Sequence, residues 1–180
     1  MRRLLFSYQK IAKSLLMSEA LEKMVDEVCE TLECDRASVF MLDELNAELW
    51  TKVGSGSENT TRIPLDSGIE GAVVRNDSAE NIEDVYRDAR FERATDKRTG
   101  YRTKSMLCVP IKDQHDQIIG VTEAINKLGG DRFARDDLCL LEWFSANAGI
   151  ILRNSIRFDE SILHLHRLRQ MMIGAGRLSE

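Results

Sequence analysis

The chain has 180 residues, of which 43% are hydrophobic and 31% charged, and it contains two prolines. This length and composition are typical of one globular domain with a sizeable core and helical extensions. The net charge of −5 argues against a nucleic-acid surface. No apolar run approaches the roughly 20 residues of a membrane span. Neither nucleic acid nor a membrane is therefore expected as a partner.

The first half of the chain alternates between helical and strand periodicity. Leucines and aromatic residues at helical spacing predict a first helix, and Ser18 is expected to cap a second one that carries a clear apolar stripe. Two strands flank a polar turn as a hairpin, and Pro64 in the third strand indicates a sheet edge. In chain order, these elements are helices over 4–15 and 21–32 and strands over 37–42, 49–53 and 61–66.

The second half opens on a short helix with Ser67 as its expected cap and Asn76-Asp77 as its exit. A brief extended piece follows over 80–85. The charged segment 86–104 has no periodicity and is long for a connection inside a domain, so it is interpreted as a lid or binding loop. The remaining elements are two strands over 105–113 and 117–126, joined by a turn, and a long helix from about residue 135.

The long helix carries an apolar heptad ladder that predicts a coiled-coil seam, with a second copy of the chain as its simplest partner. The ladder consists of Ala148, Ile151, Ser155, Phe158, Ile162, Leu165 and Met172. We expect an N-terminal helical extension over 1–18, a domain over 19–155 and a helical linker or coiled coil over 156–180. We therefore expect a homodimer through the terminal helices. The sequence does not say whether the paired helices run parallel or antiparallel.

Strands at hairpin spacing imply a mainly antiparallel sheet of about six strands. Helices from both chain ends are expected to cover one face, with the short helix and the lid over the other. The predicted fold class is therefore α+β.

Four cysteines lie at positions 29, 34, 108 and 139, and no two form a C-x-x-C pair. Zinc sites and thioredoxin-like motifs are therefore unsupported, and no metal site is expected. Apolar residues surround three of the cysteines, which favours reduced structural thiols in a cytosolic protein. The opening residues lack a cleavage site, so an amphipathic helix is preferred to a signal peptide and a cytoplasmic location is expected.

Several stretches in order resemble a GAF domain, the small-molecule sensor module of cyclic-nucleotide phosphodiesterases, adenylyl cyclases and many bacterial signalling proteins. They are RASVFMLDE, RIPLDSGIEGAV, NIEDVYRDARFERATDKRTGYRTKSMLCVPI and IIGVTEAINK, and the likeness covers about 21–155. The stretch NKLGGDRFARDD is similar to the N-K-x(n)-F-x-x-x-D-E motif of the cyclic-nucleotide-binding members. Asn126, Lys127, Phe133 and Asp137 match that motif, whereas Leu138 replaces its Glu. The resemblance implies that Lys127 and Asp137 brace the last strand against the last helix.

The resemblance also implies a ligand pocket, whose residues carry over position by position. A serine on the first strand would contact the purine, the short helix would face the phosphate, two lid threonines would contact the ligand, and a strand glutamate would accept its hydrogen bonds. The matching positions are Ser38, Gly68, Ile69, Glu70, Gly71, Thr99, Thr103 and Glu123, with Gly54, Ser55 and Phe91 at the pocket wall.

Two positions depart from the better-known binders. Gly54-Ser55 stands where those proteins carry a stacking Phe and a base-reading Asp, and Glu92 follows Phe91 where a Tyr is often seen. Loss of a stacking ring removes about 1–3 kcal/mol of binding free energy. Other readings also stand: Ser38 as a core hydroxyl, Thr99 and Thr103 as loop caps, and Glu123 on a solvated face.

Two functions are therefore weighed. The first is a non-catalytic regulatory domain that binds cAMP or cGMP and biases the helices leading to a downstream catalytic module. The second is a dimerising signalling scaffold whose pocket is empty or holds another small molecule. The sequence does not choose between the two nucleotides. It shows no nucleophile–base constellation and implies no cofactor beyond such a regulatory ligand.

Overall fold

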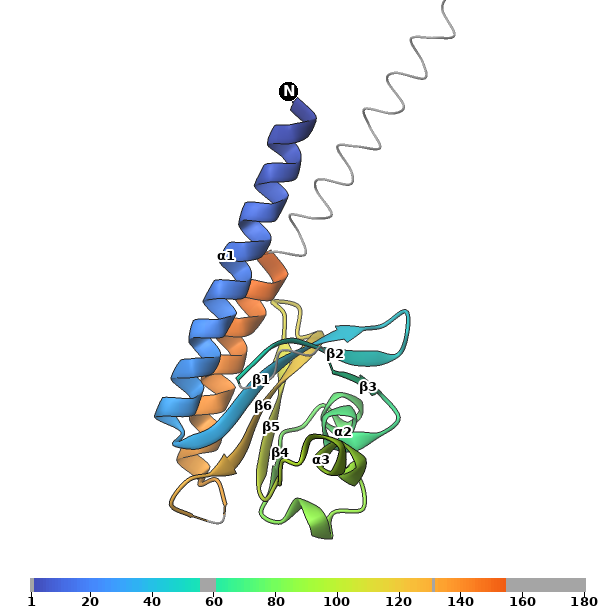
Figure 1. The fold of residues 1–180 in the computed structure, drawn as a ribbon, viewed down its shortest axis with the longest axis vertical. Coiled ribbons are helices and arrows are strands. Elements are labelled where there is room, and N and C mark those ends of the chain that lie inside the picture. Colours follow the sequence, from blue (N-terminus) through green and yellow to red (C-terminus); the bar gives the residue numbers. More distant parts are fainter. Residues whose placement is uncertain (1, 56–60, 131, 155–180) are drawn as a thin grey trace, which may run out of the picture.

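The computed structural model describes residues 2–55, 61–130 and 132–154. Six strands form one antiparallel sheet with the order β3-β2-β1-β6-β5-β4 (Figure 1). The strands are β1 (Cys34–Asp43), β2 (Glu48–Gly54), β3 (Arg62–Pro64), β4 (Glu80–Ile82), β5 (Met106–Lys112) and β6 (Ile118–Lys127). The strand that contains Pro64 lies at a sheet edge, as predicted.

Helices cover both faces of this sheet. Helix α1 (Arg2–Thr31) and the C-terminal helix over 135–154 run side by side along one face (Figure 1, blue and orange). Helices α2 (Gly68–Asn76) and α3 (Arg93–Thr99) lie on the other face, together with the short 3₁₀ helix η1 (Val85–Arg87). The α+β class and the arrangement of its layers are therefore confirmed.

Alternation along the central strands divides the core in two. Ala37 and Val39 of β1 pack among the residues under α1 and the C-terminal helix. Phe40 of β1 and Val121 of β6 instead pack with Ile69 of α2. Successive strand residues point to opposite faces, so each central strand contributes to the helix-covered core and to the floor beneath α2 and the lid.

Two local expectations were wrong, and a third, the cap of α2, holds in position only. Helix α1 is continuous through Ser18, so this residue caps no second helix. Ser67 occupies the N-cap position of α2, but its hydroxyl donates to the carbonyl of Pro64 and makes no capping bond. The segment 86–104, expected to be irregular, contains α3.

Only the first two members of the predicted heptad ladder have described side chains. Ala148 is fully buried and Ile151 packs against the core under the helices, so both contribute to this domain's own interior. The remaining members, from 155 onward, lie outside the described residues. None of the helices in the described part of the chain could span a lipid bilayer.

Candidate ligand-binding cavity

A cavity of about 390 Å³ lies between the sheet and the segment over 86–104, hereafter the lid. Its floor comes from the face of β1, β2 and β6 that is turned away from α1. Most of the predicted pocket residues meet there, although they come from segments far apart in the chain. Those that line the cavity are Ser38, Gly54, Ser55, Gly68, Glu70, Phe91, Thr99, Thr103 and Glu123.

Two predicted pocket residues do not line it. Ile69 is 1% exposed and packs in the core beneath α2. Gly71 lies where a Cβ would come within 2.7 Å of the carbonyl oxygen of Leu65. Because consecutive residues of a helix point in different directions, Gly68 and Glu70 face the cavity while their neighbours pack away from it.

Glu123 lies buried on the cavity floor, with only 6% of its surface exposed. It shares a strand face with Val121 and Ile125, and that face is covered by α2 and the lid, so the solvated reading was wrong. The Glu70 side chain lines the same cavity. Burial, followed by the repulsion and hydrogen bond from Glu70, raises the pKa of Glu123 well above its usual range. The neutral acid is therefore the favoured form.

This raised pKa predicts a specific pH dependence of stability. Between the ordinary glutamate pKa and the raised pKa of Glu123, the native state holds a proton that the unfolded chain has lost. The free energy of unfolding therefore falls by up to about 1.4 kcal/mol per pH unit as pH rises through that window. Glu123→Gln, which mimics the neutral acid, should remove this part of the slope. Urea unfolding of both proteins from pH 5 to 8 measures it, and parallel curves would contradict the assignment.

The hydroxyl groups of the two lid threonines are engaged within the lid itself. Thr99 Oγ1 donates to the carbonyl of Thr95 at 2.9 Å, which satisfies a group at the end of α3. Thr103 donates to Asp96 through its backbone N–H at 2.8 Å and its hydroxyl at 2.9 Å. Tyr86 donates its phenolic hydrogen to the same carboxylate at 3.0 Å. Asp96, which the sequence did not single out, therefore organises the lid.

An aromatic side chain of the lid also borders the cavity. Tyr101 donates to Asp35 Oδ2 at 2.5 Å and accepts a hydrogen bond from the Asn126 amide at 2.8 Å. The Arg36 guanidinium lies 3.9 Å from the centre of its ring. Burial and the bond to Asp35 raise the pKa of Tyr101. Together with Phe91, the Tyr101 ring supplies aromatic surface on the lid side of the cavity. On the β2 side, Gly54 and Ser55 supply none.

Each residue of the N-K…F…D motif has a structural contact. Asn126 bonds to Tyr101, the Arg102 carbonyl and the Lys104 N–H, and so fastens the end of the lid to β6. Lys127 Nζ lies 3.1 Å from Asp137 Oδ1 and 2.7 Å from the Leu32 carbonyl oxygen. In addition, Phe133 is 2% exposed in the helix-covered core, and Asp137 Oδ2 accepts from the Ala134 N–H at the start of the last helix.

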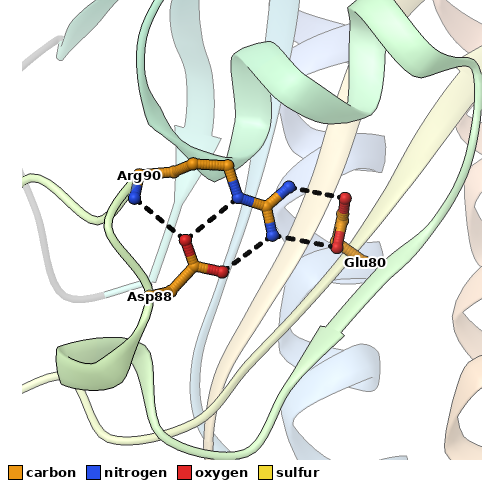
Figure 2. A network of polar contacts seen from close by, with 3 residues as sticks. All are labelled: Glu80, Asp88 and Arg90. Carbon is orange, nitrogen blue, oxygen red and sulfur yellow. Dashed lines mark hydrogen bonds and ion pairs between the residues drawn. The ribbon is translucent and has the colours of Figure 1, made fainter.

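The first part of the lid is fixed by a second ionic cluster. Arg90 makes two bonds to Glu80 of β4, at 2.7 and 3.1 Å, and also binds Asp88 (Figure 2). The hydrogen bond from Arg90 lowers the pKa of Asp88, and the two carboxylates raise the pKa of Arg90. Both ends of the lid are thus held to sheet residues, Glu80 and Asn126, with Asp96 between them.

Charge is unevenly distributed around the cavity. Arg62 and Arg98 lie exposed at its rim, with Arg36 partly exposed. Glu70 of α2 and Glu123 of β6 are the acidic pair that lines the interior. The N-terminus of α2, expected to face a phosphate, is approached by the Glu70 carboxylate, which lies 2.8 Å from the position of a Gly68 Cβ. An anionic group is therefore better accommodated beside the arginines.

The family model for the GAF domain matches residues 17–152, and the chain belongs to this family. The chain is 31% identical to dual 3′,5′-cyclic-AMP and -GMP phosphodiesterase 11 of Drosophila melanogaster, with 98% of this chain and 13% of that protein covered. It is 32% identical to the phosphodiesterase 11A of Takifugu rubripes, over 90% of this chain and 19% of that protein. The chain thus spans less than a quarter of the length of these relatives.

Solved structures share the fold at lower identity. The GAF domain of a Coxiella burnetii phosphoenolpyruvate-protein phosphotransferase has a TM-score of 0.71 at 17% identity, covering 87% of this chain and 96% of that one. The free methionine-R-sulfoxide reductase of Neisseria meningitidis has a TM-score of 0.66 at 16% identity, covering 87% and 93%. At these identities the likeness concerns the fold, and the ligand must be argued from the cavity.

Proposed function

We propose that this chain is a non-catalytic regulatory GAF domain that binds cAMP or cGMP in the cavity beneath the lid. The observation that carries the proposal is the convergence of residues from five strands, α2 and the lid on one cavity of about 390 Å³. This volume falls within the range of small-molecule sites. The rim arginines suit a phosphate and the floor carboxyl groups suit the amino and ring N–H groups of a purine.

The relatives favour cyclic nucleotides over other small molecules. Two of them are named as phosphodiesterases for both cyclic AMP and cyclic GMP, and this chain corresponds to a minor part of each. None of the described residues that line the cavity is a cysteine or a histidine. This composition favours binding over thiol chemistry, and we assign catalysis to a downstream module of a cytoplasmic signalling protein.

The scaffold function remains the second candidate because of Gly54 and Ser55. Their side chains supply no ring on the β2 side of the cavity, and Ser55 is engaged with the backbone of Ala37. A ligand would therefore stack only against the lid aromatics, which lowers its affinity. Under this function the domain dimerises and the cavity is empty or holds a different small molecule.

Calorimetric titration with cAMP and cGMP in parallel tests the proposal. We expect a dissociation constant in the micromolar range or tighter for one of them. Ser38→Phe, which fills the cavity floor, should weaken binding at least tenfold. Leu45→Phe adds a ring at a turn position that is 98% exposed and serves as the control. No heat from either nucleotide at millimolar concentration would leave the scaffold function.

Dimerisation is proposed through the outer face of the C-terminal helix. Trp143 and Ile150 are 61% and 62% exposed and lie seven residues apart, with Leu140 at 38% on the same helix. Large apolar side chains grouped this way mark an association surface. Trp143→Glu with Ile150→Glu should shift the chain toward monomer in sedimentation velocity, because two buried charges would oppose the contact. A dimer that survives both changes would exclude this face.

A further inference from the structure

Two cysteines meet where α1 ends and β1 begins. Glu33 has a left-handed backbone with φ 46°, and its N–H donates to the carbonyl of Glu30 at 3.3 Å. This is the pattern of a Schellman motif, a helix C-terminus that ends on a left-handed residue. In such a motif, the residue that follows the left-handed one frequently contacts the helix residue five positions before it. Those residues are Cys34 and Cys29. The Cys34 thiol also points to the carbonyl of Val28 at 4.0 Å, which places Cys34 against the turn of α1 that carries Cys29.

The two sulfur atoms have different surroundings. Cys29 is partly exposed, and its Sγ lies 3.6 Å from Ser55 Oγ. Cys34 is 4% exposed, and its thiol points to the carbonyl of Arg36 at 3.6 Å. The neighbouring Cys34 side chain lowers the pKa of Cys29 to about 6, opposed by burial and aided by Ser55. Cys29 and burial in turn raise the pKa of Cys34.

We propose that Cys29 and Cys34 are an oxidation site in which Cys29 reacts with a peroxide and Cys34 resolves the product as a disulfide. The Cys29 thiolate attacks one peroxide oxygen, the O–O bond breaks, and the leaving hydroxide takes a proton to become water. Cys34 then loses its proton and attacks the sulfenic sulfur, and the S–O bond breaks to release a second water. Two electrons pass from the sulfurs to the peroxide.

The arrangement suits this order of events. Cys29 combines partial exposure with a stabilised thiolate, which are the properties of a reactive cysteine. Cys34 is buried beside it and protonated, so it is available only to a sulfenic acid already formed at Cys29. Cys108 is fully buried and Cys139 is exposed without such a partner among the contacts of the described residues.

The pair also contacts the wall of the ligand cavity. Ser55 lines that cavity and binds Ala37 through both its hydroxyl and its backbone N–H. Oxidation removes the thiolate from the Ser55 hydroxyl, so the redox state is transmitted to the junction of β1 and β2. The oxidation site itself does not depend on which ligand the cavity takes.

The first experiment measures alkylation of Cys29 against pH. Iodoacetamide labelling, read peptide by peptide, should give a midpoint near pH 6 in the native chain. Cys34→Ser removes the sulfur neighbour and should move this midpoint up by more than one pH unit. Cys34→Ala repeats the test if serine disturbs the helix end, and the urea-unfolded chain gives the ordinary midpoint near 8.5. An identical midpoint in native, substituted and unfolded chains would overturn the proposal.

The second experiment detects the disulfide directly. Cys139→Ser is used as background so that the exposed thiol does not compete. After treatment with hydrogen peroxide, the tryptic peptide over 24–36 should lose two hydrogen atoms and resist alkylation until a reductant is added. With Cys34→Ser the same peptide should instead gain oxygen at Cys29. Peptides that gain oxygen to the same extent with and without Cys34 would show that Cys34 resolves nothing.

Discussion

Lys127→Met should lower the free energy of unfolding by about 3 kcal/mol, because it leaves the Asp137 carboxylate uncompensated. The two side chains are 17% and 10% exposed, and Lys127 also binds the Leu32 carbonyl at the end of α1. One ammonium group thus joins α1, β6 and the last helix. Urea unfolding at pH 7 measures the loss.

Two comparisons separate this brace from a generic charge effect. Lys127→Met combined with Asp137→Asn removes the unpaired charge while keeping an acceptor for the Ala134 N–H. It should be more stable than Lys127→Met alone. Lys112→Met breaks a more exposed pair with Asp77 and should change stability little. Equal losses for the two lysines would exclude a brace at Lys127.

Asp96→Ala should open the lid more than any other single change in α3. Asp96 is the only buried residue of that helix, and its carboxylate accepts three hydrogen bonds from Tyr86 and Thr103. Unsatisfied buried donors cost about 1–3 kcal/mol. A loss of about 2 kcal/mol raises the open population roughly 30-fold. Amide hydrogen exchange over 93–105 measures it.

Thr95→Ala is the matched control for the lid. Thr95 is exposed on the same helix and contributes only its backbone carbonyl to Thr99. Exchange over 93–105 should be nearly unchanged in this variant, and so should its global unfolding transition. Equal exchange rates in the two variants would mean that apolar contacts, rather than Asp96, hold the lid closed.

The strands and their order along the chain were predictable because alternation and turn chemistry are local. Pro64 indicated an edge because it lacks the N–H that a central strand needs. Burial of Glu123 was not predictable from alternation. Periodicity indicates that Val121 and Glu123 share one face of the strand. It does not indicate whether that face is covered, because the covering elements, α2 and the lid, come from elsewhere in the chain.

The lid helix and its organiser could not be found from periodicity. Helix α3 has the sequence RATDKRT, with no apolar stripe. Its stability comes from Asp96 contacting Thr103 and Tyr86, which are outside the helix. The motif match indicated Thr103, but not that its hydroxyl is already bonded. Tyr101 lies within the stretch that carries the family resemblance, and its contact with Asp35 joins residues 66 apart in sequence.

The continuity of α1 has a mechanical consequence. A helix of 30 residues is about 45 Å long, and its N-terminal half extends past the edge of the sheet (Figure 1). Its C-terminal end is fixed beside Lys127 and Cys34. A small rotation of the helix about that anchored end therefore displaces its N-terminal end by a larger distance. A break at Ser18 would absorb such a rotation, whereas an unbroken helix carries it to its tip.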